Sequence, residues 1–176
     1  MKTIVYVGTS LDGFLAREKG DIDWLSGFES DEVFRSYGEF MKTIDAFVIG
    51  RRTFEKVSTF ASWPYQKMVY VLSTSLTGIP EGLRGKATIL SMKPKDLLQY
   101  LSTQGLSTIY VDGGKVIQEF LREDCIDEMI VTKVPVLIGR GIPLFGYLSN
   151  DLLFDHIRTE TYSNGLVKSH YRRIRT

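Results

Sequence analysis

The chain has 176 residues, of which 43% are hydrophobic and 24% charged, and its formal net charge is +1. This length and composition are typical of one globular domain, and the near-neutral charge argues against nucleic acid or an anionic membrane as a partner. One cysteine and two histidines exclude a Cys/His metal cluster and a disulfide framework.

The amino terminus lacks the long apolar region and cleavage site of a signal peptide, and it is predicted to be a strand, Thr3 to Gly8. No apolar run approaches the ~20 residues of a membrane helix, so we expect a cytoplasmic protein. Asp12-Gly13 marks a tight turn after the first strand, and Phe14 to Ala16 resumes an apolar path. The following loop, Asp21 to Gly27, carries one large anchor, Trp24.

A strand that turns directly into a helix is the first phosphate-binding candidate. After a helix predicted over residues 30–43, the short apolar run Ala46 to Ile49 is predicted as a buried strand that stops at Gly50. The next helix starts at once, which leaves backbone N–H groups and the positive end of the helix dipole free for an anion. Its first residues are donors suited to phosphate: Arg51, Arg52 and Thr53. A glycine turn with two solvated arginines explains this stretch, taken alone, equally well.

The middle of the chain alternates strands with helices. Strands are predicted at Lys67–Leu72, Thr88–Ser91 and Ser107–Val111, and helices at Pro94–Thr103 and Val116–Arg122. The first of these strands ends in the hydroxyl run Ser73-Thr74-Ser75, and the third ends in Asp112-Gly113-Gly114-Lys115. The third strand therefore repeats the arrangement at Gly50, with glycine and a basic residue at the start of a helix.

The last third of the chain predicts an antiparallel edge. A strand at Met129–Val134 precedes two closing strands, Phe154–Tyr162 and Leu166–Arg173, which flank an Asn-Gly hairpin turn. We interpret Arg172, Arg173 and Arg175 as a solvated basic end. The pattern predicts one α/β domain over residues 1–176, with a mostly parallel central sheet flanked by helices and an antiparallel C-terminal hairpin.

Three predicted strand ends carry groups that suit phosphate, and this coincidence favours one ligand over unconnected turns. In open α/β sheets, ligands bind beyond the carboxyl ends of the strands, so we predict an extended phosphate-bearing ligand, most simply a dinucleotide. The familiar fingerprints are absent. Gly113-Gly114-Lys115 lacks the upstream glycine of a P-loop, and Gly139-Arg140-Gly141 lacks the third glycine and the helix of a dinucleotide fingerprint.

Five stretches in the right order resemble the dihydrofolate reductase superfamily, over nearly the whole chain. They are Ser10–Ala16, Trp24–Gly27, Asp45–Glu55, Val111–Val116 and the Pro-x-x-x-Gly-x-Gly segment within Pro135–Phe145. The chain is most similar to the reductase domain of bifunctional riboflavin-biosynthesis proteins and its stand-alone relatives. The resemblance implies a dihydrofolate reductase-like fold, NADPH as hydride donor, a small-molecule substrate and no metal.

The resemblance also assigns cofactor-binding residues. It implies that Arg51, Thr74 and Lys115, with Ser73 beside them, contact the 2′-phosphoribose. Around the pyrophosphate it places Gly50, Arg52, Thr53, Gly113, Gly114 and Val116. Cationic and hydroxyl groups that meet one extra phosphate would explain a preference for NADPH over NADH.

For the substrate, the resemblance implies a pocket between Asp12, Trp24 and the start of the helix at residues 30–43, with Thr132 on its floor. Reduction of a C=N bond needs a proton as well as a hydride. Glu29, Asp31 and Glu32 all lie near, and Asp31 is the predicted donor, although an acid favoured by the helix dipole explains it as well.

The favoured activity is therefore NADPH-dependent reduction of a pterin- or flavin-precursor-type substrate. The first candidate is reduction of the ribosyl C1=N linkage in 5-amino-6-(5-phosphoribosylamino)uracil, a step of riboflavin biosynthesis. The alternatives are dihydrofolate reduction and NADP(H) binding without turnover. The resemblance and the apolar run Val136-Leu137-Ile138 also predict a homodimer.

Overall fold

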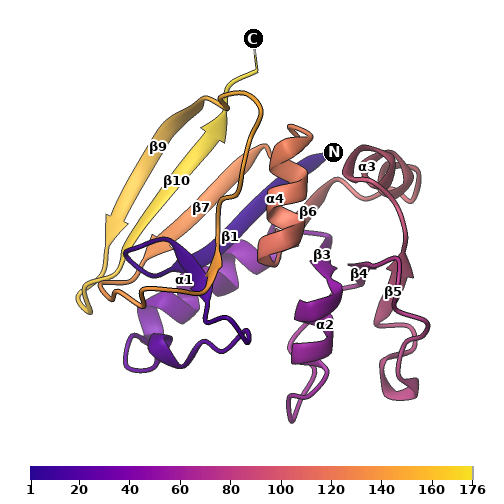
Figure 1. The fold of residues 1–176 in the computed structure, drawn as a ribbon, viewed down its shortest axis with the longest axis horizontal. Helices are drawn as coiled ribbons and strands as arrows, with labels where there is room; N and C mark the ends of the chain where they lie inside the picture. Colours follow the sequence, from indigo (N-terminus) through magenta and orange to yellow (C-terminus); the bar gives the residue numbers. More distant parts are fainter. Residues whose placement is uncertain (176) are drawn as a thin grey trace.

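The structure, a computed structural model, describes residues 1–175 and is built on one eight-stranded sheet (Figure 1). The strands lie in the order β5-β4-β3-β6-β1-β7-β10-β9. Their bounds are β1 Lys2–Thr9, β3 Ala46–Gly50, β4 Val69–Leu72, β5 Ala87–Leu90, β6 Thr108–Asp112, β7 Glu128–Lys133, β9 Phe154–Thr161 and β10 Val167–Arg173. Neighbours from β5 to β7 are parallel, whereas β10 is antiparallel to β7 and to β9. The predicted fold class, with its antiparallel closing hairpin, is confirmed.

Four α-helices accompany the sheet in the described residues: α1 Asp31–Lys42, α2 Arg51–Val57, α3 Pro94–Thr103 and α4 Gly114–Arg122. Ser30 caps α1 as predicted, because its hydroxyl accepts a hydrogen bond from the Val33 N–H. Helix α4 begins two residues before the predicted start at Val116. The Ile117 N–H donates to the Gly113 carbonyl and closes the first turn, so the helix begins at Gly114. No helix of the described part is both long and apolar enough to cross a membrane.

Two apolar layers hold the helices against opposite faces of the sheet. Along β1, Ile4 belongs to one layer and Val5 and Val7 to the other, as the two-residue period of a strand requires. The layer that contains Val5 includes buried residues of α3 and α4: Leu97, Leu101, Ile117 and Phe120. The other layer includes Phe40 of α1 and Phe54 of α2.

A second, two-stranded sheet joins segments that are far apart in the chain. β2 (Phe14–Ala16) pairs antiparallel with β8 (Ile142–Pro143), which periodicity did not predict. Two short 3-10 helices, η1 (Asp23–Leu25) and η2 (Glu81–Leu83), were also missed. The β2–β8 pair places the loop that contains Asp12 beside the Pro135–Phe145 segment.

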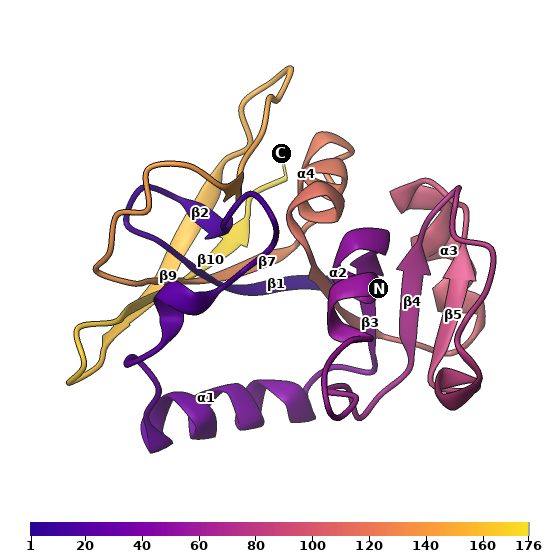
Figure 2. The same ribbon diagram turned by 60° about the horizontal axis from the view of Figure 1, so that its bottom comes forward.

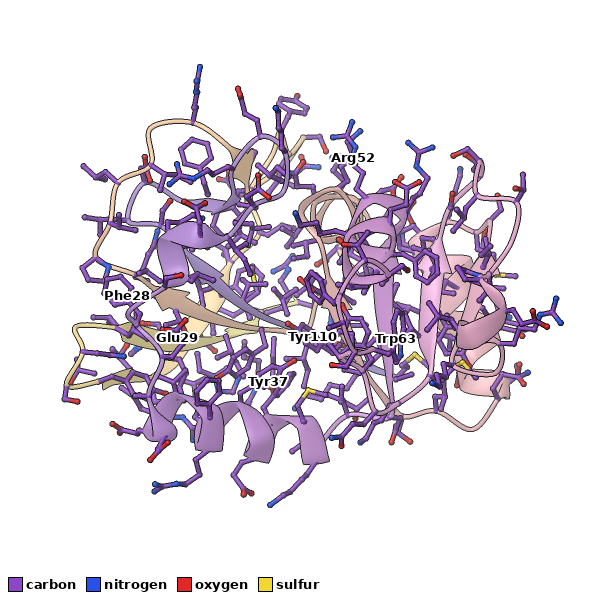
Figure 3. All side chains as sticks on the ribbon, turned by 90° about the horizontal axis from the view of Figure 1, so that it is seen from below. Phe28, Glu29, Tyr37, Arg52, Trp63 and Tyr110 are labelled. Carbon is purple, nitrogen blue, oxygen red and sulfur yellow. The ribbon has the colours of Figure 1, made fainter. Side chains whose placement is uncertain are left out.

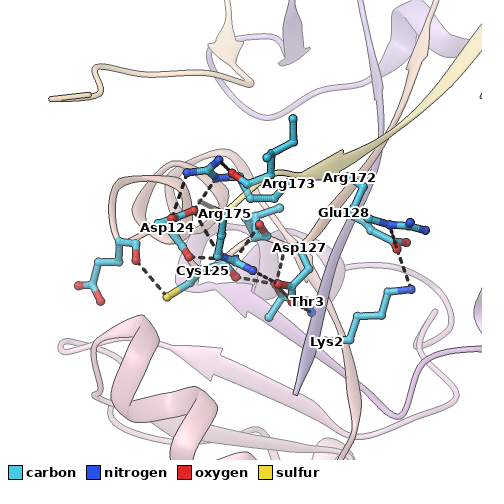
Figure 4. Close-up of polar contacts among 12 residues, drawn as sticks. Lys2, Thr3, Asp124, Cys125, Asp127, Glu128, Arg172, Arg173 and Arg175 are labelled. Atoms are coloured by element: carbon cyan, nitrogen blue, oxygen red, sulfur yellow. Dashed lines mark hydrogen bonds and ion pairs between the residues drawn. The ribbon is translucent and has the colours of Figure 1, made fainter. Parts of the chain in front are cut away.

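The predicted solvated basic end is only partly right: Arg172 and Arg175 are exposed, but all three arginines are paired with acids (Figure 4). Arg173 Nε lies 2.7 Å from Asp124 Oδ1, and Arg175 Nη1 lies 2.5 Å from Asp127 Oδ1. Arg172 reaches Glu128, which also pairs with Lys2 and His170. The carboxyl-terminal strand is thereby fixed to the ends of α4 and β7, which explains its basic composition without an external partner.

Helix α1 lies across one face of the sheet, apart from the other helices (Figure 2). Phe40 near its carboxyl end is its one buried residue, so apolar packing holds the rest of the helix only loosely. Polar contacts from the β9–β10 hairpin hold the amino-terminal part: Lys168 Nζ donates to Ser36 Oγ, and Asn164 Nδ2 donates to the Phe28 carbonyl. This arrangement leaves room for a groove beneath α1.

Candidate active site

The three predicted phosphate-binding turns lie at one edge of the sheet. They follow β4, β3 and β6, which are adjacent and parallel, so their carboxyl ends point the same way. Gly50 pairs with Leu72, and Ile49 pairs with Asp112. Arg51 Nη1 donates a hydrogen bond to Ser75 Oγ at 3.1 Å, which brings the turns after β3 and β4 into direct contact.

The two glycine turns interlock too closely for larger residues. Gly113 has φ of +94°, a left-handed conformation that favours glycine, and a Cβ there would lie 2.6 Å from Thr53 Oγ1. A Cβ on Gly50 would lie 2.9 Å from Val116 Cγ2. The turns after β3 and β6 therefore pack against each other through Thr53 and Val116. The glycines are required by this close approach.

Cationic groups surround this edge and remain available to an anion. Arg51, Arg52 and Lys115 are exposed, and Figure 3 shows Arg52 pointing away from the sheet into solvent. Arg51 has a weak partner in Glu55, with Nε and Oε1 3.6 Å apart. Among the described residues, no acidic group lies within ion-pair distance of Arg52 or Lys115. The edge thus presents several cations next to the backbone N–H groups of the α4 amino terminus, a donor set that suits phosphate.

The hydroxyl run after β4 is ordered by its own side chains. Ser73 Oγ accepts hydrogen bonds from the N–H groups of Ser75 and Leu76, at 3.2 and 2.9 Å. This turn leaves Thr74 exposed beside Arg51. The Thr74 hydroxyl therefore lies near the Arg51 guanidinium, which bonds the neighbouring Ser75. The assignment of Arg51 and Thr74 to one phosphate requires this proximity.

A groove lies between α1 and the sheet, close to the same edge. Its volume is about 240 Å³, and its lining is Tyr6, Gly8, Leu25, Phe28, Glu29, Val33, Phe34, Tyr37, Thr132, Val134, Tyr162 and Leu166. Figure 3 shows Tyr37 of α1 facing the sheet and Phe28 and Glu29 at the end of the helix. A larger hollow of about 430 Å³ opens on the opposite side of β7 and β10. We favour the groove as the substrate site because Gly8 and Thr132, which line it, lie near the carboxyl ends of β1 and β7, and these strands run parallel to β3, β4 and β6.

Asp112 is a carboxyl group at the end of β6, in the second glycine turn, and its charge acts on Tyr37, which lines the groove. From the sequence it is predicted only as part of a turn. Burial raises the pKa of Asp112, and a hydrogen bond from the Gly113 N–H, 2.7 Å from Oδ1, offsets part of this effect. Burial, with the nearby Asp112 charge, also raises the pKa of Tyr37 to about 12. Side chains alternate along β6, so Asp112 lies on the same face of the sheet as Tyr110, the face that α1 covers. This alternation is the sequence signal that could have identified Asp112 as a group on the α1 side.

We predict that Asp112→Asn stabilises the protein at neutral pH. When the pKa of a carboxyl group is higher in the folded than in the unfolded protein, ionisation of that group destabilises the fold. The free energy of unfolding therefore falls as pH rises from the unfolded pKa, about 3.9, through the folded pKa. At pH 7 the asparagine removes this cost, and the free energy of unfolding should rise. Below pH 3.5 both side chains are neutral and the difference should vanish. Urea unfolding at pH 7 and below pH 3.5 measures the difference in free energy of unfolding between the variant and the wild type. The same difference at both pH values would contradict the assigned direction of the Asp112 pKa.

The predicted substrate-binding residues have different positions in the structure. Thr132 lines the groove as predicted. Trp24 is buried in an apolar cluster with Val134, Tyr162 and Leu166, and so supports the groove wall. The Asp12 carboxylate accepts hydrogen bonds from Ser10 Oγ at 2.6 Å and from the N–H groups of Gly139 and Ile138 at 2.8 and 3.3 Å. These hydrogen bonds, of which the one from Ser10 has the largest effect, lower the pKa of Asp12. The bonds from Ile138 and Gly139 also tie the Asp12 loop to the Pro135–Phe145 segment.

The predicted proton donor, Asp31, is exposed in the first turn of α1 and does not line the groove. Glu29, two residues earlier, does line it, and its Oε2 accepts a hydrogen bond from the Gly27 N–H at 2.8 Å. Helical periodicity does not distinguish these acids, because Glu29 precedes the helix. Within the described residues, no group of three acidic, histidine or cysteine side chains could hold a metal ion.

Comparison with known proteins identifies the architecture that carries this site. The crystal structure of a putative riboflavin biosynthesis protein from Shewanella sp. PV-4 is 40% identical, with a TM-score of 0.94, over 99% of this chain and 100% of that chain. The bifunctional diaminohydroxyphosphoribosylaminopyrimidine deaminase/5-amino-6-(5-phosphoribosylamino)uracil reductase from Thermotoga maritima is 18% identical (TM-score 0.77). The match covers 98% of this chain and 56% of that chain.

Dihydrofolate reductase from Enterococcus faecalis, solved with NADP(H), shares the fold at 16% identity and a TM-score of 0.69, over 98% of this chain and 96% of that chain. The family model described as the RibD C-terminal domain matches residues 1–168. The resemblance to the reductase domain of riboflavin-biosynthesis proteins is therefore confirmed, because this chain belongs to the RibD C-terminal domain family.

Proposed function

We propose that the protein is an NADPH-dependent reductase of a small flavin- or pterin-precursor substrate. The observation that carries the proposal is the meeting of three turns, after β3, β4 and β6, at the sheet edge toward which the parallel strands β1 and β7 also run, and Gly8 and Thr132 near the ends of these two strands line the groove under α1. The related Thermotoga protein is named as a 5-amino-6-(5-phosphoribosylamino)uracil reductase, which supports a reductase of riboflavin biosynthesis. Reduction of the ribosyl C=N bond of that compound is the first candidate reaction.

The donor set at the sheet edge fits NADPH. Arg51, Thr74 and Lys115, with Ser73 ordering their loop, would hold the 2′-phosphate. The residues that would surround the pyrophosphate are Gly50, Arg52, Thr53, Gly113, Gly114 and Val116. The chemistry that NADPH supplies when bound is a hydride, whereas the protein contributes binding, orientation and a proton. The Enterococcus dihydrofolate reductase, which has the same fold, was solved with NADP(H), and this supports the choice of cofactor.

The substrate would lie in the groove, on Thr132 and under Tyr37. Apolar residues of α1 and of the hairpin form most of its lining, so a bound molecule would displace water from the groove, which strengthens its polar contacts. Asp12 and Trp24 would act indirectly, by fixing the loops that form the wall. Of the neighbouring acids, Glu29 is better placed than Asp31 to touch a substrate, because only Glu29 lines the groove.

The test is NADPH oxidation, followed at 340 nm, with 5-amino-6-(5-phosphoribosylamino)uracil, its dephosphorylated form and 7,8-dihydrofolate. Turnover of the first compound supports the proposed reaction, and turnover of dihydrofolate alone would replace it with the second activity predicted from the sequence. Tight NADPH binding without turnover of any compound would indicate a binding protein. Light scattering on the same sample would decide the proposed homodimer, for which Leu137, 68% exposed, offers an apolar contact.

A further inference from the structure

A buried lysine lies behind the groove wall, and the proposed function does not yet use it. Lys168 on β10 is 6% exposed and pairs across the sheet with Thr132. Its Nζ lies 2.6 Å from Glu160 Oε2 on β9 and donates to Ser36 Oγ on α1 at 2.5 Å. A buried ammonium group is costly unless it is paired and hydrogen-bonded, and here it is both.

The contacts of Lys168 continue into the groove through two hydroxyl groups. Ser36 Oγ lies 3.4 Å from the Tyr6 hydroxyl, and Tyr6 lines the groove. The Tyr6 ring is stacked on Phe40 at 4.6 Å between centroids, which restricts where the hydroxyl can point. A continuous polar chain therefore runs from Glu160, which is partly exposed, through Lys168 and Ser36 to Tyr6.

We propose that the Tyr6 hydroxyl donates the proton of the reduction, and that Lys168, acting through Ser36, is a positioning residue for it. This inference rests on the proposed function. As the substrate C=N carbon accepts the hydride, the π bond breaks and its electron pair moves to nitrogen, which takes the Tyr6 proton. NADPH is oxidised to NADP⁺ and the substrate is reduced to the amine. The phenolate then recovers a proton from solvent along the chain that ends at Glu160.

The chemistry of a phenol in this place suits a proton donor. Burial raises the pKa of Tyr6, so the hydroxyl keeps its proton at neutral pH. The Ser36 hydrogen bond and the Lys168 charge act in the opposite direction, since both stabilise the phenolate that forms after transfer. Hydrogen bonds to Glu160 and Tyr162 outweigh the burial of Lys168 and raise its pKa, so the cation persists. The ionisable groups near Tyr6 are Tyr37 of α1, Tyr110 of β6, Glu160 of β9, Lys168 of β10 and Tyr162 of the hairpin turn.

The first test removes only the hydroxyl. Tyr6→Phe keeps the ring and its stacking, and kcat with the active compound of the panel should fall about 100-fold or more, with NADPH affinity and melting temperature unchanged. Tyr70→Phe, on the opposite face of the sheet, is the matched control and should keep wild-type kcat. Wild-type kcat in Tyr6→Phe would overturn the proposal. The proposal would also be overturned if Asp112→Asn lost activity and Tyr6→Phe did not, because the donor role would then belong to Asp112.

The second test does not depend on turnover. The enzyme is prepared with 3,5-difluorotyrosine at position 6, whose phenol is more acidic than that of tyrosine, and its ionisation is followed by ¹⁹F NMR against pH. Lys168→Met should move the midpoint upward, Ser36→Ala should do so as well, and Lys168→Arg should restore part of the shift. An unmoved midpoint in Lys168→Met would overturn the role of Lys168.

The two tests fail separately. If the wild-type protein oxidises NADPH with no compound of the panel, the proposed function and the donor role of Tyr6 are both overturned. The NMR titration would still decide whether Lys168 and Ser36 control the Tyr6 hydroxyl. If the wild-type protein is active but Tyr6→Phe is equally active, the proposed function stands and only this inference is overturned.

Discussion

Arg51→Ala should weaken NADPH binding by about 1.5–3 kcal/mol and leave NADH binding almost unchanged. Arg51 is exposed at the start of α2, and its guanidinium already bonds Ser75, next to Thr74. A charge-assisted hydrogen bond to the 2′-phosphate is worth this amount, and NADH has no such phosphate. Fluorescence titration with both cofactors measures the difference. An equal loss for NADPH and NADH would reject the assignment of Arg51 to the 2′-phosphate.

Two further variants make the Arg51 result specific. Arg84→Ala removes another exposed arginine, which pairs with Glu81 and precedes β5 at the far end of the strands. It should leave both affinities unchanged, which controls for the overall loss of positive charge. Glu55→Gln removes the weak partner of Arg51 and should strengthen NADPH binding slightly, by a few tenths of a kcal/mol.

Gly113→Ala should reduce the free energy of unfolding by about 2–4 kcal/mol and abolish tight NADPH binding. The φ of +94° is strained for any residue with a Cβ, and that Cβ would lie 2.6 Å from Thr53 Oγ1. Either the turn or the Thr53 side chain must move, and both carry groups assigned to the pyrophosphate. Urea unfolding and NADPH titration measure the two effects. Wild-type stability in this variant would mean that the turn adopts another conformation.

A double-mutant cycle separates the two causes of this loss. Thr53→Ala in the Gly113→Ala background removes the contact with Oγ1 and should recover part of the stability, while the strain from φ remains. Gly38→Ala is the matched control, because Gly38 lies within α1 with no atom near the added Cβ. That substitution should stabilise the protein by about 0.5–1 kcal/mol through helix propensity.

Local sequence patterns predicted most elements of the fold correctly. Two-residue alternation and short apolar runs identified the eight strands of the main sheet within one or two residues. The Ser30 cap identified the start of α1. These signals act over a few residues, so they survive without knowledge of the partner strand. The grouping of the three polar turns could also be predicted, because parallel neighbouring strands bring their carboxyl ends to one edge.

Contacts between distant segments decided the rest. The pairing of β2 with β8 depends on residues more than 100 positions apart, and it determines that Asp12 binds the backbone at Ile138 and Gly139. The same holds for the carboxyl-terminal arginines, whose acidic partners lie 44 to 49 residues away. The amino-acid composition gives no information on which acid each of these arginines contacts.

The sequence by itself thus determined the α/β architecture, the glycine turns and the cationic edge, because strand periodicity and turn chemistry are local properties. Only the tertiary structure decided which side chains face the groove: Glu29 lines it and Asp31 does not, while Tyr6 reaches Lys168 through Ser36. The physical reason is that the orientation of α1 over the sheet is set by long-range contacts from the β9–β10 hairpin, 130 or more residues away in the chain.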